Sequence, residues 1–520
     1  MPTPRRNGLF LAAVVANLLP VVWFSHLPSG DGPAHVYNAS LIGRYLFHPA
    51  DPVRTFLQFN WSLPPNLLTH GLLATLMAVM SPHVAERVFV ALYVVLLPFA
   101  LRYAMRGGTR ETGGVEFLGL VAVFNYHFHW GFYNFIAGLV AYLFALGYWL
   151  RLRERPPTWR RLTVMATLVC VAYFCHPVPL VEFWLTAGAL YAIDARRTRS
   201  WRLGEIRQLM LASTPAGCLY LHYLMARAAG PSVPVEWPPV RFAGSVLVKL
   251  FPLSTFTPVE RLSALSLSAT IAAAAAWAWS MKATDRNARG LFCASALVAL
   301  AVFAAPMQAA GGTLITTRLV YFPLFLSLIW LATVKWPASW AAGFAAAGIG
   351  FTVIGLVSRW PIYERYDQRM TSFLDMASSR DGGALEFFKN AGNGIAVTLD
   401  KSGTPALSAG AWGYVAANRR SVLLSDYEAG LDYFPFIYRA GVTPTPSRGL
   451  LNAHDCPLAD KLIDDSLADG SPRPAISEIV WIDADRRESE DAACLAAYGK
   501  RIVAERSSAD GTLVWIDGHR

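Results

Sequence analysis

The sequence predicts a mainly α-helical membrane protein of many spans that ends in a small soluble α/β domain. Of the 520 residues, 54% are hydrophobic and only 15% are charged, which is too apolar for one soluble domain of this length. Long apolar runs fill residues 1–357, whereas residues 358–520 are polar enough to fold in water. We therefore expect a transmembrane domain over residues 1–357 and a soluble domain over residues 358–520.

The first apolar run, residues 8–27, follows Arg5 and Arg6. At about 1.5 Å per helical residue it is long enough to cross the hydrocarbon core. A cleaved signal peptide would look similar, but no clear small-x-small cleavage site precedes Ser29 and many apolar runs follow. We expect an uncleaved first span with a cytoplasmic N-terminus.

Later apolar runs continue this pattern, although several are shorter than the roughly 20 residues of a standard span. They fall at residues 85–101, 115–127, 132–150, 162–176, 179–194, 208–227, 262–281, 290–308, 319–334 and 340–357. Basic residues concentrate in every second connection, as the positive-inside rule predicts for cytoplasmic loops. This accounts for the net charge of +10 without nucleic acid, which we exclude as a partner. About eleven spans in the cytoplasmic membrane, with an extracytoplasmic C-terminal domain, place these basic connections on the cytoplasmic side.

One further apolar run, residues 66–80, would reverse the alternation if it crossed. It is short, begins after Pro64-Pro65 and ends at Ser81-Pro82, which favours a juxtamembrane helix. The first outer loop then covers residues 29–85 and carries a second amphipathic piece at residues 36–47.

The candidate catalytic residue lies at the start of this loop, in Gly30-Asp31-Gly32-Pro33. Placing an acidic residue in a turn beside a membrane span costs free energy, so such a residue usually has a function. The structural alternative is that Asp31 is an N-cap residue of a following helix, which Asp-Gly-Pro also fits.

The chain resembles the C-type glycosyltransferases, which include aminoarabinose transferases and protein O-mannosyltransferases. The resemblance rests on the first span, Asp31 near its outer end, the long outer loop, Pro64-Pro65-Asn66-Leu67 and Glu86-Arg87. It implies a polyprenyl-phosphate sugar donor, an acceptor reached from the outer face, and a periplasmic soluble domain. The chain departs from the family in having one acidic residue where many members have an Asp-Glu pair, and Leu63 where some have Lys.

Glycosyl transfer needs a general base for the acceptor hydroxyl and positive groups for the departing phosphate. Asp31 is the predicted base, and His35, one helical turn later, is predicted to assist it. For the donor phosphate the candidates are Arg318, at the outer start of a span, and Arg241 and Lys249, which flank an amphipathic piece at residues 242–251. A snorkelling role for Arg318 and ordinary headgroup contacts for the other two remain open.

The second outer loop supplies the predicted substrate-binding side chains. It reads Asn125-Tyr126-His127-Phe128-His129-Trp130-Gly131-Phe132-Tyr133-Asn134, and we assign its two His and two Asn, with His70, to the substrate site. An aromatic belt at the interface is the alternative. No cofactor is assigned. A divalent metal ion bound by His127, His129, His35 and Asp31 stays open, because the set lacks diagnostic spacing.

The C-terminal part alternates helical and strand patterns. We expect helices at residues 370–391 and 409–418, and strands at residues 394–399, 421–424, 479–482, 501–505 and 512–516. Cys456 and Cys494 are predicted to form a disulfide outside the cytoplasm. The segments 426–428 and 432–435 mix acids with rings, as sugar-binding surfaces do, although solvated loops are commoner.

Together these features predict a cell-envelope glycosyltransferase that acts on a lipid, glycan or protein acceptor. Two alternatives stay open: a lipid-linked glycan ligase or polymerase, and a transporter or flippase without transferase activity. A transporter should carry ionisable or broken-helix features near mid-membrane, whereas the polar residues here gather at the outer ends of spans.

Overall fold

The computed structural model describes residues 3–109, 111–153, 155–229, 234–281, 286–309, 312–376, 384–389, 405, 411–423, 426–440, 442, 476–482, 502–507 and 514–518. By their internal contacts they form two compact units. The helical unit comprises Met1–Trp23 and Val90–Pro361, and the mixed unit comprises Phe24–Phe89 and Ile362–Arg520. This division differs from the predicted one because the first outer loop packs with the C-terminal part.

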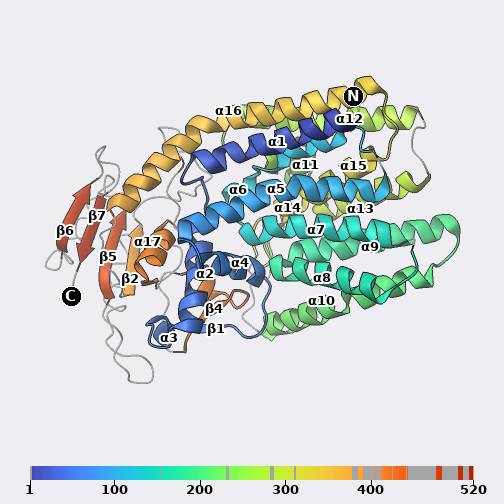
Figure 1. Ribbon diagram of the computed structural model, residues 1–520. Helices are drawn as coiled ribbons and strands as arrows, with labels where there is room; N and C mark the ends of the chain where they lie inside the picture. The colour runs from blue at the N-terminus through green and yellow to red at the C-terminus, as the bar shows by residue number, and fades with distance from the viewer. Residues whose placement is uncertain are drawn as a thin grey trace. The chain divides into compact units, whose positions relative to one another are not determined.

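Long helices dominate the helical unit (Figure 1). They are α1 (Thr3–Trp23), α5 (Pro82–Gly108), α7 (Tyr133–Leu152), α8 (Trp159–Cys175), α9 (Pro177–Thr198), α10 (Leu203–Ala229), α12 (Pro258–Ser280), α13 (Arg286–Phe303), α15 (Tyr321–Ala332) and α16 (Ala338–Met376). Within this unit α7 packs on α8 and α9, α8 packs on α10, and α13 packs on α9 and α15. The apolar runs of the sequence thus form a helical bundle, as predicted.

Seven helices among the described residues are long and apolar enough to cross a membrane, judged by length and composition. They are Arg5–Trp23, Pro82–Gly108, Tyr133–Leu152, Pro177–Thr198, Pro258–Ser280, Ile315–Ala332 and Ala338–Asp375. The predicted spans at residues 162–176, 208–227 and 290–308 coincide with α8, α10 and α13, which are helical but lie outside this set.

The predicted span at residues 115–127 is not one helix. Its residues form the 3-10 helix η1 (Val115–Ala122) and the four-residue helix α6 (Tyr126–His129). Asn125 explains the interruption, because its side-chain Oδ1 accepts a hydrogen bond from the Phe128 amide at 3.0 Å and caps α6 instead of continuing the first helix. Three further short elements belong to this unit: α11 (Val240–Lys249), η2 (Phe251–Leu253) and α14 (Ile315–Leu319). The amphipathic piece predicted at residues 242–251 lies mostly in α11.

The mixed unit combines four short helices with small sheets. Its helices are α2 (Gly32–Phe47), α3 (Val53–Phe56), α4 (Leu67–Met77) and α17 (Trp412–Arg419), with the 3-10 turn η3 (Glu428–Gly430). Parallel strands lie in the order β3 (Val422–Leu423), β2 (Ala384–Lys389), β5 (Ile476–Ile482). Two antiparallel pairs join β1 (Leu57–Phe59) to β4 (Phe436–Tyr438), and β6 (Ile502–Ser507) to β7 (Val514–Gly518).

Most of the elements predicted for the mixed unit are present. Helices α2 and α4 confirm the two short helices of the outer loop, α17 confirms the helix at 409–418, and four predicted strands correspond to β3, β5, β6 and β7. The helix predicted at residues 370–391 is wrong in its second half, because residues 384–389 form β2 between β3 and β5. The strand predicted at residues 394–399 lies outside the described residues.

Helix α2 organises the core of the mixed unit. Its Val36, Tyr37 and Leu41 are fully buried in a cluster with residues of α3, α16 and α17. Two polar contacts fix α2 to the C-terminal segment. The Tyr37 hydroxyl accepts a hydrogen bond from the Leu423 amide at 2.7 Å, and Arg44 donates to the Ser421 carbonyl at 2.8 Å. Helix α2, whose N-terminus carries Asp31, is therefore held by groups far away in the sequence.

The close approach of α17 to α2 depends on Gly413. A Cβ at this position would lie 2.3 Å from the Pro33 carbonyl oxygen, so Gly413→Ala is expected to destabilise the mixed unit by about 1–3 kcal/mol through overpacking. Gly43→Ala is the matched control, because no atom lies within 4 Å of its added Cβ and alanine favours a helix interior by roughly 0.5–1 kcal/mol. Thermal unfolding in detergent measures both, and equal Tm values for the two variants would contradict the expectation.

Candidate functional site

Asp31 lies at the N-terminus of α2 and is partly exposed. It occupies the N-cap position, but its side chain makes no capping hydrogen bond. Ser29 takes that role, since its hydroxyl accepts from the Gly32 amide at 3.1 Å. Asp31 is therefore the N-cap residue of α2 by position, as the structural alternative expects, although the hydrogen bond from the start of the helix goes to Ser29. The positive end of the α2 dipole stabilises a negative charge at this position.

His35 lies one turn further along α2, and its ring is directed to a buried group. Its backbone amide donates to the Asp31 carbonyl at 3.0 Å, as expected within a helix. Its ring Nδ1 lies 2.6 Å from Glu428 Oε1 and 3.1 Å from His70 Nε2. His70 Nε2 in turn lies 2.9 Å from Glu428 Oε2. We name His35, His70 and Glu428 the His-Glu-His cluster.

Burial and charge set the protonation of this cluster. Burial alone would raise the pKa of Glu428, but His35 and His70 outweigh it and hold this pKa at about 2. Burial alone would lower the pKa of His35, but the Glu428 carboxylate outweighs it and raises this pKa. Nearby, burial and the Glu428 charge raise the pKa of Asp426 to about 8. Glu428 therefore loses its proton at a much lower pH than Asp426 does.

The solvated-loop interpretation of residues 426–428 is wrong. Asp426 is 3% exposed and Glu428 is fully buried. Asp426 Oδ1 accepts from the Asn38 side-chain amide at 3.0 Å and from the Glu428 amide at 3.2 Å. These residues hold the C-terminal segment against α2 and α4.

Asn125, His127 and His129 are fully buried in the helical unit. The His127 ring lies 2.9 Å from the Tyr321 hydroxyl and 3.1 Å from the Thr317 hydroxyl. The Asn125 side chain donates to the Tyr93 hydroxyl at 2.9 Å and accepts from the Tyr321 hydroxyl at 3.0 Å. The network links α5, α6, α14 and α15, so its members hold the interrupted region around α6 in place.

The remaining residues predicted from this loop are buried as well. His129 Nδ1 lies 2.9 Å from the Asn125 carbonyl and 3.0 Å from the Thr255 hydroxyl. Asn134 is 4% exposed, and its Oδ1 has no hydrogen-bond partner in the described part of the chain. Substrate contact by these four side chains stays a prediction.

The three candidate phosphate ligands differ in exposure. Arg318 is 8% exposed, its guanidinium lies over the Phe132 ring at 4.3 Å, and its Nη1 lies 2.9 Å from His176 Nε2. Arg241 and Lys249 are exposed at the two ends of α11. Arg241 and Lys249 are therefore accessible to a lipid phosphate from solvent, whereas Arg318 is covered by aromatic rings.

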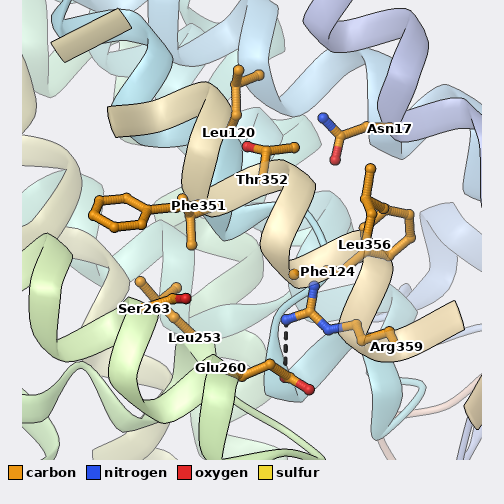
Figure 2. Close-up of a pocket in the computed structure, with 12 residues that line it drawn as sticks. Asn17, Leu120, Phe124, Leu253, Glu260, Ser263, Phe351, Thr352, Leu356 and Arg359 are labelled. Carbon is orange, nitrogen blue, oxygen red and sulfur yellow. Dashed lines mark hydrogen bonds and ion pairs between the residues drawn. The ribbon is translucent and has the colours of Figure 1, made fainter. Parts of the chain in front are cut away.

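A small pocket lined by both polar and apolar side chains lies inside the helical unit. Figure 2 shows Arg359 of α16 and Glu260 of α12 paired at its edge, with Asn17 of α1, Ser263 and Thr352 among the lining side chains. Arg359 Nη2 donates to Glu260 Oε2 at 3.0 Å, and the two residues are 5% and 2% exposed. Glu260 also accepts from the Thr255 amide at 2.8 Å and completes a capping box with Thr257. The pair thus fixes the start of α12 to α16.

Two residues of the cluster were assigned separately from the sequence, and one was missed. His35 was expected to assist Asp31 and His70 to contact substrate, whereas the structure brings both rings onto Glu428. Glu428 had a weak signal in the sequence, the mixture of acids and rings at residues 426–428. The predicted disulfide of Cys456 and Cys494 lies outside the described residues.

Comparisons with known proteins locate the fold. No protein-family model and no curated protein matches the chain. The crystal structure of ArnT from Cupriavidus metallidurans bound to undecaprenyl phosphate is similar, with a TM-score of 0.53 and 11% sequence identity. The similarity covers 99% of this chain and 98% of that chain. The chain is therefore a multi-pass membrane protein with the fold of ArnT, an aminoarabinose transferase of the C-type class.

Proposed function

We propose that this chain is a glycosyltransferase that moves a sugar from a polyprenyl-phosphate donor to a lipid, glycan or protein acceptor at the outer face of the cytoplasmic membrane. The main support is the similarity over almost the whole chain to ArnT, solved with undecaprenyl phosphate bound. The basic connections between apolar runs support a cytoplasmic N-terminus and a periplasmic C-terminal domain from residue 358 onward.

In the proposed reaction Asp31 accepts the proton of the acceptor hydroxyl. The acceptor oxygen forms a bond to the anomeric carbon of the sugar, and the bond from that carbon to the phosphate oxygen breaks. Polyprenyl phosphate leaves with the bonding electron pair, and cationic side chains stabilise its charge. Its place at the N-terminus of α2 and its partial exposure support Asp31 as this base.

We propose that the exposed side chains of Arg241 and Lys249 contact the departing phosphate. Their exposure on α11 supports this role. Arg318 is proposed as a further phosphate ligand, and its hydrogen bond to His176 and its place over Phe132 would orient the guanidinium.

Mass spectrometry of cell-envelope lipids and glycans tests the function directly. Cells without the gene are expected to lack one sugar on one envelope component and to accumulate the polyprenyl-phosphate donor. Restoring the gene should restore the sugar. An unchanged envelope in cells without the gene would contradict the proposal, and loss of a whole glycan chain instead of one sugar would favour the ligase or polymerase.

Binding of the lipid phosphate gives a second test. Undecaprenyl phosphate is expected to raise the Tm of the purified chain, since a ligand at about 100 times its Kd stabilises the folded state by about 2.7 kcal/mol. Undecaprenol, which lacks the phosphate, is the control and should raise the Tm less. The double variant Arg241→Gln/Lys249→Gln should reduce the shift, and a full shift in this variant would remove the two residues from the phosphate site.

A further inference from the structure

The His-Glu-His cluster brings together three ligand atoms from distant parts of the chain. His35 lies on α2, His70 on α4 and Glu428 on η3, and 358 residues separate the last two. The separations are 2.6 Å from His35 Nδ1 to Glu428 Oε1, 2.9 Å from His70 Nε2 to Glu428 Oε2, and 3.1 Å between the two ring nitrogens. All three belong to the mixed unit.

The hydrogen bonds of His70 determine which of its nitrogens can bind a cation. Its Nδ1 lies 2.8 Å from the Asn66 carbonyl oxygen, an acceptor, so Nδ1 carries the proton. In the neutral ring Nε2 then presents a lone pair, and this lone pair faces Glu428 Oε2. A lone pair and a carboxylate oxygen at 2.9 Å require a positive centre between them or beside them.

Two imidazole nitrogens and one carboxylate are a common set of protein ligands for zinc. Tetrahedral zinc bonds of about 2.0–2.2 Å place neighbouring ligand atoms about 3.3 Å apart, so the observed separations of 2.6, 2.9 and 3.1 Å need to open by about 0.2–0.7 Å. The Asn66 carbonyl on the second nitrogen of His70 is the kind of outer hydrogen bond that orients a metal-bound histidine.

Burial also suits a structural ion. His70 and Glu428 are fully buried and His35 is 3% exposed, and the Phe434 ring lies 5.8 Å from the His70 ring and 6.3 Å from the His35 ring, centre to centre. A buried divalent ion would offset the burial of the carboxylate and cross-link three elements.

We propose that His35, His70 and Glu428 bind a zinc ion that ties α2 and α4 of the first outer loop to the C-terminal segment. The site lies one helical turn from Asp31, so the ion would hold the start of α2 without acting in the transfer itself. This proposal does not rest on the proposed function, because zinc content and stability are measured without any sugar substrate.

The test measures zinc in the full chain, purified with an affinity tag that contains no histidine and without chelators. Elemental analysis is expected to find about one zinc per wild-type chain. His70→Gln and Glu428→Gln should each lower the zinc content at least ten-fold. His48→Gln is the matched control, because His48 is an exposed histidine of the same unit just beyond α2 and should leave the zinc content unchanged.

Two measurements on the wild-type chain test the proposal even if the variants fail to fold. Removing zinc with a chelator should lower the Tm, and adding zinc back should restore it. Cobalt exchanged into the site should give the visible absorption of a four-coordinate ion. A wild-type chain without zinc, full zinc in both ligand variants, or a Tm that chelation leaves unchanged would each overturn the proposal. A metal-free cluster whose variants still unfold at lower temperature would identify a proton-sharing network instead.

Discussion

Asp31→Asn is expected to lower the rate of sugar transfer by about 10²–10⁴-fold, the usual contribution of a general base. The amide has the shape of the carboxylate but cannot accept the acceptor's proton. Because Asn is about as favourable as Asp at the N-cap position, the substitution should leave the Tm nearly unchanged. The loss should appear in kcat more than in KM, since proton transfer occurs in the transition state.

The assay mixes the purified chain with donor-loaded membranes and the acceptor, and it measures the labelled sugar that reaches the acceptor. The Tm is measured on the same samples. Asp375→Asn is the control, because Asp375 is an exposed acid of the mixed unit and should keep wild-type activity. Asp31→Glu should retain part of the rate, since a carboxylate remains nearby. Wild-type transfer by Asp31→Asn would remove Asp31 from the reaction, whereas equal loss in both Asn variants would point to a general effect of charge.

The sequence predicts those parts of the fold that depend on local pattern. The apolar runs predict the bundle helices, and Pro33, Pro64 and Pro65 mark the starts of α2 and α4. The break at Asn125 was missed because a residue that caps a four-residue helix leaves the hydrophobicity of residues 115–127 unchanged. Hydropathy therefore predicted one span where the backbone forms two short helices, η1 and α6.

Long-range pairing accounts for the other differences. Ala384, Leu385 and Glu386 favour a helix locally, but pairing with β3 and β5 makes them a strand. The three-residue strands β1 and β4 depend on pairing with each other and on packing against the core of the mixed unit, so neither had a signal of its own. For the same reason no pattern in the sequence could join His35 and His70 to Glu428.

Arg359→Met is expected to destabilise the helical unit by about 3–5 kcal/mol, because it leaves the buried carboxylate of Glu260 without its cationic partner. Methionine keeps most of the length and apolar contacts of the arginine stem, so the loss reports the charge and its hydrogen bond more than packing. Glu260→Gln should also destabilise, because it leaves the Arg359 guanidinium buried opposite a neutral amide. Its glutamine can keep the capping box with Thr257.

The double variant Glu260→Gln/Arg359→Met distinguishes a charge pair from two independent contacts. With both charges removed no buried ion is left unpaired, so its loss should be clearly smaller than the sum of the two single losses, with a coupling of about 0.5–3 kcal/mol. Reversible unfolding in mixed detergent measures all four chains of this cycle. Additive losses would mean that Arg359 and Glu260 act separately. Coupling would identify their pair as a contact that fixes the start of α12 to α16 beside the pocket of Figure 2.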